Sequence, residues 1–392
     1  MKKNDTHTLQ KETELAEGPL TPQESRTQEF WRLLRKNRLA LAGLIIFVFF
    51  FFIALGGLVL TSGNKPVFDP AMVRLQEKLR PPLSEPRLED LSPAEIPTLG
   101  IYLLGTDDLG RDVFSRMLQG AWVALTVGFV AVGISVLIGI VMGGISGYFG
   151  RNPVRIDHIL VAVIVIVGGG LLISGSLFSG GVLLLIGCVY ILSPLLRRRG
   201  WERQSARGVM SFLFKDAISI DTLVMRLVDI MLCFPVFFLI LTVVAILPAS
   251  MYNIMIIIGL TSWMGTTRFV RAELLSLREQ DFVTAAKALG VSNWRIIFRH
   301  MIPNAMAPVL VSATIGIANA ILIEAGLSFL GFGVPPPHAT WGNIISAGKE
   351  FIFDAPWLTF IPGFAILIVV LAFNLFGEGL RDILNPKLRE RY

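Results

Sequence analysis

The decisive stretch of this chain is a polar interruption between two apolar runs, with the sequence DFVTAAKALGVSNWRIIFRHMIP at residues 281–303. Apolar residues recur at helical spacing in its first part, which predicts a short helix from Asp281 to Leu289. Gly290 follows at the position where a helix can end in a left-handed turn at little cost. Pro303 stands where the next apolar run begins, and proline is tolerated in the first turn of a helix.

The second half of the stretch predicts another short helix. Ser292 or Asn293 can cap it, and it carries Arg295 and Arg299. Small residues on one face of the first helix would let another backbone approach closely, as a docking surface requires. From the residues alone, the segment is therefore either a helical loop lying on the membrane surface or a docking surface for another protein.

The composition indicates an all-α polytopic membrane protein. Of 392 residues, 53% are hydrophobic and 16% are charged, well below the roughly 25% charged residues of soluble domains. The net charge is +6, but the basic residues cluster at the ends of apolar runs, where they set membrane orientation. Nucleic-acid binding is therefore not expected.

No motif in the sequence indicates catalysis or metal binding. The two cysteines, Cys188 and Cys233, lie inside apolar runs and do not suggest a disulfide framework or a metal site. The sequence has no zinc-protease motif, no nucleophile elbow and no phosphate-binding loop. The chain is therefore expected to bind no cofactor, and if it works with ATP another chain must bind the nucleotide.

The N-terminal part predicts a tail followed by a membrane span. Residues 1–30 are polar and predict a flexible cytoplasmic tail. Residues 31–61 contain an uncharged run, Leu39–Leu60, that is too long for a signal peptide and predicts the first transmembrane span. Basic residues before this run place the N-terminus in the cytoplasm.

Residues 62–117 predict an extracytoplasmic loop followed by an interfacial helix. Thr106 or Asp107 can cap this helix, with Asp108 in its first turn. A cation site is the alternative, because Asp112 adds a third carboxylate, but the stretch lacks the glycine-bearing pattern of a calcium loop. A charged helix leading into the membrane is the preferred interpretation.

The remaining chain predicts seven more apolar runs and a basic tail. Residues 118–150 form one span, and residues 151–222 hold an inserted hydrophobic hairpin and a basic cytoplasmic segment, with a re-entrant pair as the alternative. Residues 223–380 hold the other spans and the loop 271–303, and residues 381–392 form a basic cytoplasmic tail. The expected spans in this part are 223–247, 252–269, 304–329 and 357–376. The total is about eight spans, and Pro235 can kink the first of this last group.

The 281–303 stretch resembles the Glu-Ala-Ala motif of permease subunits in ATP-binding-cassette (ABC) importers. The matching residues are Thr284, Ala285, Ala286, Gly290, His300, Ile302 and Pro303. Thr284 stands where that family has Glu, and His300 replaces the first Ile, while the spacing of glycine and proline is kept. The resemblance implies that this loop couples the permease to ATPase subunits.

Other stretches resemble the second, C-type permease of dipeptide and oligopeptide importers. They are Gly105–Asp112, Leu327–Pro337, Trp341–Asn343 and Leu371–Asp382. The likeness covers about residues 30–150 and 220–390. It does not extend to about 151–220, where this family passes almost directly from one span to the next.

The resemblance implies a fold and a function. The fold is the six-span core of a type I ABC importer permease, here with the inserted hairpin. The chain would form half of a translocation pore in the bacterial inner membrane, with both termini cytoplasmic. Its partners would be a second permease, two cytoplasmic ATPases that bind ATP and Mg²⁺, an extracytoplasmic binding protein that delivers di- or oligopeptides, and membrane lipid. Nickel-chelate or opine-like cargo and a stand-alone secondary transporter are the alternatives.

Three ionisable residues inside the spans are further candidates, because such groups are costly in a bilayer. Arg226 and Asp229 lie three residues apart and form either a structural pair or part of the pore lining. Glu324 either lines the pore or makes a hydrogen bond between packed helices.

Overall fold

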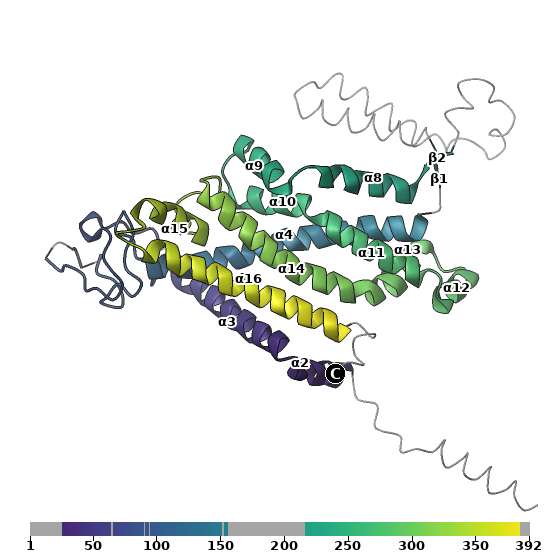
Figure 1. Ribbon diagram of the computed structural model, residues 1–392, viewed down its shortest axis with the longest axis horizontal. Coiled ribbons are helices and arrows are strands. Elements are labelled where there is room, and N and C mark those ends of the chain that lie inside the picture. The colour runs from purple at the N-terminus through teal and green to yellow at the C-terminus, as the bar shows by residue number, and fades with distance from the viewer. Residues whose placement is uncertain are drawn as a thin grey trace, which may run out of the picture.

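The computed structural model describes residues 26–63, 66–89, 91–93, 95–150, 153–155 and 216–384. These ranges form one elongated bundle of helices (Figure 1). The expected tail at 1–30, apart from its last five residues, and both apolar runs of the expected hairpin lie outside the described residues.

The elements follow one another along the chain with these bounds: α2 Arg26–Lys36, α3 Arg38–Thr61, η1 Leu75–Glu77, α4 Val113–Phe149, β1 Pro153–Arg155, β2 Asp216–Ser219, α8 Ile220–Cys233, α9 Val236–Ile246, α10 Met251–Thr261, α11 Trp263–Leu277, α12 Asp281–Ala288, α13 Asn293–Arg295, η2 Ile296–Met301, α14 Ile302–Phe329, α15 Trp341–Gly348, η3 Lys349–Phe351 and α16 Trp357–Leu384.

The bundle has two ends of different construction (Figure 1). The α15 end consists of α15 and the loop residues 66–112, which lie beside one another. The α12 end consists of α12, α13 and the C-terminal ends of α4 and α11.

Helix α4 is the central element, and α3, α10, α11 and α14 all pack along it. Its 37 residues give it a length of about 55 Å at 1.5 Å per residue, so it reaches both ends of the bundle. Gly139, Gly143 and Gly147 lie against α11 so closely that a Cβ at Gly143 would stand 2.7 Å from the carbonyl oxygen of Thr267. Small residues of this kind allow membrane helices to pack at short distance.

The start of α4 differs from the expected interfacial helix. Asp112, and not Thr106 or Asp107, caps it by accepting hydrogen bonds from the N–H groups of Phe114 and Ser115. Thr106 pairs with Asp112 in an isolated β-bridge. No separate interfacial helix therefore forms between 106 and 117 in this described stretch: the helix that begins at Val113 is already α4.

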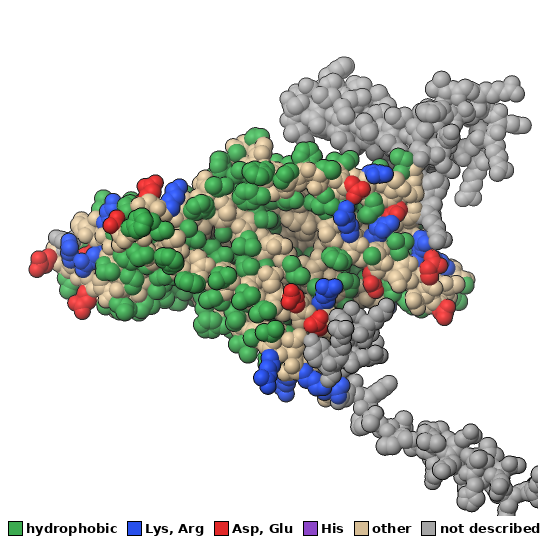
Figure 2. Space-filling view, viewed as in Figure 1, with side chains coloured by type: hydrophobic (Ala, Val, Ile, Leu, Met, Phe, Trp, Pro, Cys, Tyr) green, Lys and Arg blue, Asp and Glu red, His purple; other side chains and the backbone are tan. Residues whose placement is uncertain are grey.

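Four helices are long and apolar enough to cross a membrane in the described part of the chain. They are α3, α4, the continuous helix Asn293–Phe329 and α16. Hydrophobic side chains cover the middle of the visible face, and charged side chains gather toward its ends (Figure 2). This distribution is that of a polytopic membrane protein, whose apolar exterior contacts lipid.

Two expected spans differ from the structure, so the six-span core is not confirmed as such. The expected span 223–247 is the pair α8 and α9, bent by 80°. Pro235 causes the break, because it has no N–H and holds Phe234 in an extended conformation with ψ of 133°. The expected span 252–269 is likewise divided, at Ser262, into α10 and α11.

A short antiparallel ladder joins the two edges of the inserted segment. β1 pairs with β2 so that Pro153 lies opposite Ser219 and Val154 opposite Ile218. The segment that follows α4 and the segment that precedes α8 therefore lie side by side.

Candidate functional site

The first helix of the decisive stretch forms as predicted. α12 runs from Asp281 to Ala288, and its only fully buried side chain, Val283, anchors it to an apolar cluster with Ile296 and Met301. Gly290 has φ of +74°, a conformation that side-chain-bearing residues disfavour. The N–H of Val291 then bonds to the carbonyl of Ala286, which closes the C-terminal turn.

The second helix differs from the prediction, because it does not end before the next span. It continues from Asn293 to Phe329 without interruption, and Ser292 precedes it without a side-chain capping bond. Residues 296–301 form a wider π turn, in which the N–H of Ile302 bonds to the carbonyl of Ile297. Pro303 explains this turn, because a proline inside a helix lacks an N–H and crowds the carbonyl four residues earlier.

The matched motif residues lie together on this helical loop with different exposures. Thr284, Ala285, Gly290 and Pro303 are exposed, and Ala286, His300 and Ile302 are partly buried. A feature that the sequence reasoning missed is a set of exposed large apolar residues on the same loop. They are Phe282, Leu289, Trp294 and Phe298, with Leu289 83% exposed.

Tyr148, at the end of α4, holds the loop in place. Its hydroxyl donates to Oδ1 of Asn293 at 2.8 Å, and the ammonium of Lys287 lies 5.2 Å from the centre of its ring. The Arg278 guanidinium donates to the Tyr148 carbonyl at 3.5 Å. An open groove separates these parts, lined by Tyr148, Phe149, Arg278, Glu279, Thr284, Lys287 and Asn293.

A second set of contacts, which the sequence reasoning also missed, joins α4, α8 and α11 at the α12 end. Asp221, in the first turn of α8, pairs with Arg271 on α11 through both carboxylate oxygens, with Nη2 at 2.6 Å from Oδ2. Asp221 also accepts a hydrogen bond from Ser146 on α4 at 2.6 Å. Three helices that are distant in sequence are therefore joined at the α12 end.

Arg226 and Asp229 lie on α8, away from the loop. Asp229 contacts the Arg268 guanidinium of α11 at 2.9 Å, and Arg226 lies farther away, at 3.8 Å. All three side chains are exposed, at 75% for Arg226, 48% for Asp229 and 51% for Arg268.

Glu324 is not near this group. It is 2% exposed inside α14, accepts a hydrogen bond from Ser328 at 2.6 Å and bonds to Thr340 at the start of α15. Thr340 caps α15 through a reciprocal pair of hydrogen bonds with Asn343. The carboxylate thus lies at the positive end of a helix.

A buried polar network ties the α15 end together. Asp107 pairs with Arg111 at 2.7 Å and with Arg116, and both Asp107 and Arg116 are almost completely buried. Arg116 also donates to Oδ1 of Asn343 at 3.0 Å. This network joins the loop before α4 to the cap of α15, across more than 220 residues of sequence.

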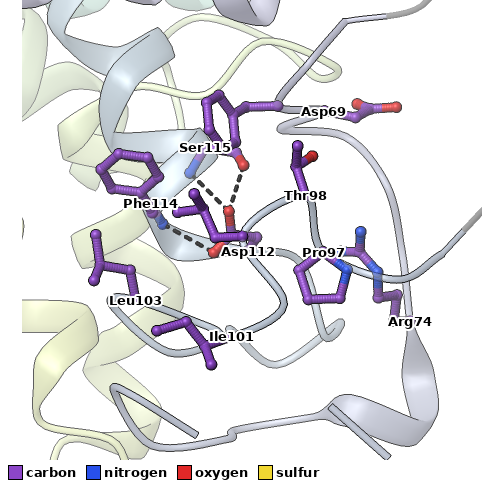
Figure 3. A pocket seen from close by; sticks show the side chains of 11 residues that line it. Asp69, Arg74, Pro97, Thr98, Ile101, Leu103, Asp112, Phe114 and Ser115 are labelled. Carbon is purple, nitrogen blue, oxygen red and sulfur yellow. Dashed lines mark hydrogen bonds between the residues drawn. The ribbon is translucent and has the colours of Figure 1, made fainter. Parts of the chain in front are cut away.

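Asp112 caps α4 by accepting hydrogen bonds from the start of that helix, as Figure 3 shows. It borders a small cavity together with Arg74 and Pro97. Burial raises the pKa of its carboxyl above the ordinary value, because the loss of water around the charged form outweighs the hydrogen bonds from Ser115. Asp107 and Asp112 therefore have separate structural partners, and the described residues contain no group of three ligands for a metal ion.

Comparison with known proteins adds to this geometry. Residues 210–390 match the family model of the binding-protein-dependent transport system inner membrane component, and residues 25–82 match the N-terminal transmembrane domain of oligopeptide transport permease C. The dipeptide transport system permease protein DppC of Alkalihalophilus pseudofirmus is 35% identical, over 92% of this chain and 90% of its own length. The chain belongs to the dipeptide and oligopeptide permeases of the binding-protein-dependent transport family.

Two further relatives are similar over nearly their whole length. The DppC protein of Haemophilus influenzae is 34% identical over 97% of this chain and 99% of its own length. The di/tripeptide permease DppC of Pseudomonas aeruginosa is 32% identical over 95% and 96%. As a permease of this family, the chain is a non-catalytic membrane subunit of an ABC transporter.

Proposed function

We propose that this permease forms half of the translocation pore of an ATP-driven importer for di- or oligopeptides. A second permease forms the other half, and an extracytoplasmic binding protein delivers the peptide. Two ATPase subunits bind ATP and Mg²⁺ and act on this chain through the loop 281–303. The names of the relatives support peptide cargo, since several are dipeptide or oligopeptide permeases.

The observation that carries the proposal is the exposed surface of α12 and the π turn. Phe282, Leu289, Trp294 and Phe298 are exposed apolar residues of one helical loop, which also carries the small residues Ala285 and Gly290. The rings of Trp294 and Phe298 are stacked, with their centroids 5.7 Å apart. An exposed apolar surface edged by charged residues is typical of a protein-binding site. We assign this surface to the groove of an ATPase subunit.

The loop 281–303 is connected to two long helices, so a movement of the loop can be passed on to them. Its second half continues into α14 as one helix, and its first half is held to α4 through Tyr148. A rotation imposed on α12 would therefore act on two long helices at once. Such a loop can bias a pore between two states when ATP closes the ATPases.

The charge distribution supports an orientation in which the α12 end faces the cytoplasm and the α15 end faces outward. Six basic residues lie on the loop and the helix before it: Arg268, Arg271, Arg278, Lys287, Arg295 and Arg299. Basic residues concentrate on cytoplasmic loops of membrane proteins. In this orientation, both termini lie on the cytoplasmic side of the bacterial inner membrane.

Replacement of Gly290 tests the role of the loop. Gly290→Val forces a β-branched residue into φ of +74°, a conformation that costs about 1–2 kcal/mol for an ordinary residue and more for a β-branched one. A Cβ there would meet no atom within 4 Å, so the effect is confined to the loop backbone. Gly290→Asn is the matched control, because Asn tolerates this conformation.

The measurement is peptide uptake and ATP hydrolysis by the purified complex in proteoliposomes. We expect the valine variant to assemble with both ATPases but to lose peptide-dependent uptake, while the asparagine variant keeps most of it. Normal uptake by the valine variant at equal expression would refute the coupling role. Purification of this chain alone from lipid-preserving conditions would refute the importer itself.

A further inference from the structure

We infer that α2 binds the headgroup of an anionic phospholipid at the membrane surface where α3 begins. The inference goes beyond the proposed function and depends neither on the cargo nor on the coupling loop. Three observations carry it. The apolar face of α2 is covered by the bundle, its other face is basic, and the exposed apolar surface of α3 begins directly after it.

The apolar face of α2 packs against the bundle. Leu34 is completely buried and lies in one apolar cluster with Ala40 of α3 and Ile383 in the last turn of α16. Phe30 and Leu33 pack against the same cluster. The chain itself therefore occupies the apolar face of this helix, and the opposite face remains for a partner.

A break in the helix separates α2 from the first span. Asn37 is extended, with φ of −86° and ψ of 94°, and its side chain caps α3 by accepting a hydrogen bond from the N–H of Ala40 at 3.1 Å. α2 is therefore a separate short helix at the end of α3 (Figure 1). Short amphipathic helices that carry basic residues and tryptophan are typical of segments that lie on a membrane surface.

The other face of α2 is basic and carries an aromatic side chain. Residues 26–38 contain five Arg or Lys residues and one acidic residue. Arg32, Arg35 and Lys36 are exposed, and Trp31 is 50% exposed. An open groove is lined by Gln28, Trp31, Arg32 and Arg35. Guanidinium groups suit phosphate oxygens, to which they can donate two parallel hydrogen bonds, and tryptophan is enriched at the depth of lipid headgroups.

The surface next to α2 favours a lipid over an acidic protein as the partner. Leu39, Ile45 and Phe49 on α3 are 65%, 60% and 65% exposed, so exposed apolar surface begins directly after Arg38. Basic side chains lie along the lower edge of the bundle, beside hydrophobic ones (Figure 2). A phospholipid combines both chemistries, because its acyl chains can cover α3 while its headgroup reaches α2. Clusters of basic residues next to a span attract anionic lipids.

Trp31 provides a native fluorescent reporter of this face. The assembled complex is reconstituted in vesicles of phosphatidylcholine and phosphatidylglycerol. Bromine atoms, which quench tryptophan, are placed near the headgroup end of the acyl chains of one of the two lipids at a time. The same measurement on Trp31→Phe, which keeps an aromatic ring, gives the contribution of all other tryptophans. The difference between the two is the quenching of Trp31, and we expect phosphatidylglycerol to quench it at a lower mole fraction than phosphatidylcholine.

Arg35 is the residue to replace, since it is exposed and lines the groove. In Arg35→Gln, half-maximal quenching by phosphatidylglycerol should require an about fivefold higher mole fraction, equivalent to the roughly 1 kcal/mol that one basic residue contributes near an anionic surface. Arg35→Lys should keep most of the preference. Arg226→Gln is the matched control, because it removes an exposed arginine from α8, on the opposite side of the bundle (Figure 1), and it should leave the preference unchanged.

Three results would overturn the inference. Equal quenching of Trp31 by both lipids would make α2 a surface helix that does not recognise the headgroup. Quenching by neither lipid would place α2 under another subunit. Equal preference in Arg35→Gln and Arg226→Gln would show that the headgroup is not bound at α2. Assembly of every variant is checked by size-exclusion chromatography. Because the measurement requires neither ATP nor peptide, each of these results leaves the proposed function intact.

Discussion

The two ends of the bundle differ in how their charged and apolar side chains are arranged. At the α15 end, Asp107 and Arg116 are 1% and 3% exposed and each has a charged or polar partner within the chain. At the α12 end, large apolar residues stand in the open, and Leu289 is 83% exposed. Exposed apolar residues also occur at the α15 end, including Leu75 and Leu83, but its pair of Asp107 and Arg116 is buried. The pair of Asp221 and Arg271 at the α12 end is partly exposed. The two ends therefore differ in how far their ion pairs are removed from water, and this difference predicts different costs when a carboxylate is lost.

Substitution of Asp107 is the most direct test of the difference between the α15 end and the α12 end. Asp107→Ala leaves Arg116 buried without its charged partner, which should cost about 3–5 kcal/mol of stability. The matched variant is Asp281→Ala, in the exposed first turn of α12, where loss of a helix-dipole interaction costs about 0.3–1 kcal/mol.

Thermal unfolding of the detergent-solubilised complex measures both variants of this pair. A large drop for the first variant and a small one for the second are expected. Equal drops would mean that the two ends do not differ in the way described.

The link between the ends can be tested in α4. Gly143→Val places side-chain atoms where the Thr267 carbonyl and Val270 of α11 already stand, and overpacking of this kind costs about 1–3 kcal/mol. Gly133→Val in the same helix is the control, because a Cβ there has nothing within 4 Å. Unfolding temperature and assembly on size-exclusion chromatography are measured, and similar losses for both variants would contradict close packing of α4 and α11.

The attachment of the loop is expected to have a smaller effect on stability and a larger one on coupling. Tyr148→Phe removes the hydrogen bond to Asn293 and keeps the ring below Lys287, a change worth about 0.5–1.5 kcal/mol. We expect more ATP hydrolysed per peptide imported, with little change in unfolding temperature. Tyr252→Phe, at an exposed position of α10, is the control, and an unchanged ratio in the Tyr148 variant would remove this residue from the coupling path.

The smallest effect is expected at Asp112. Asn replaces Asp as a helix cap with little loss, so Asp112→Asn should change stability by less than about 0.5 kcal/mol in acid. Burial raises the pKa of Asp112 from its ordinary 3.8, so the folded state disfavours the charged form. The wild type should therefore lose stability relative to the variant as pH rises through the raised pKa. Unfolding temperatures from about pH 4 to pH 7 test this, and a difference that grows toward acid would contradict it.

Local patterns predicted the local parts of this structure. The helix at Asp281 and the left-handed Gly290 follow from residue spacing and from the freedom of glycine, which need no distant partner. Pro303 lies in the first turn of α14, as predicted. Proline also suits a widened turn inside a longer helix, and residue spacing did not predict that α14 continues the helix before it. Only the continuation of the chain through both segments decides between them.

Contacts between distant segments were beyond prediction. Tyr148 and Asn293 are 145 residues apart, and Arg116 and Asn343 are 227 apart. Nothing in the sequence near either residue indicates its partner. Pro235 predicted a kink, but an 80° bend depends on how α9 packs against α10.

The ladder of β1 and β2 has a consequence for variation between related chains. Its paired residues, such as Val154 and Ile218, lie side by side, at the roughly 5 Å spacing of neighbouring strands. Arg155 and Asp216, which flank residues 156–215 in the sequence, are therefore paired neighbours. The number of residues between them can change without displacing α4 or α8. Evolution, or an engineer who wishes to attach a fluorescent domain, can lengthen, replace or delete this passage while the transport machinery stays in register.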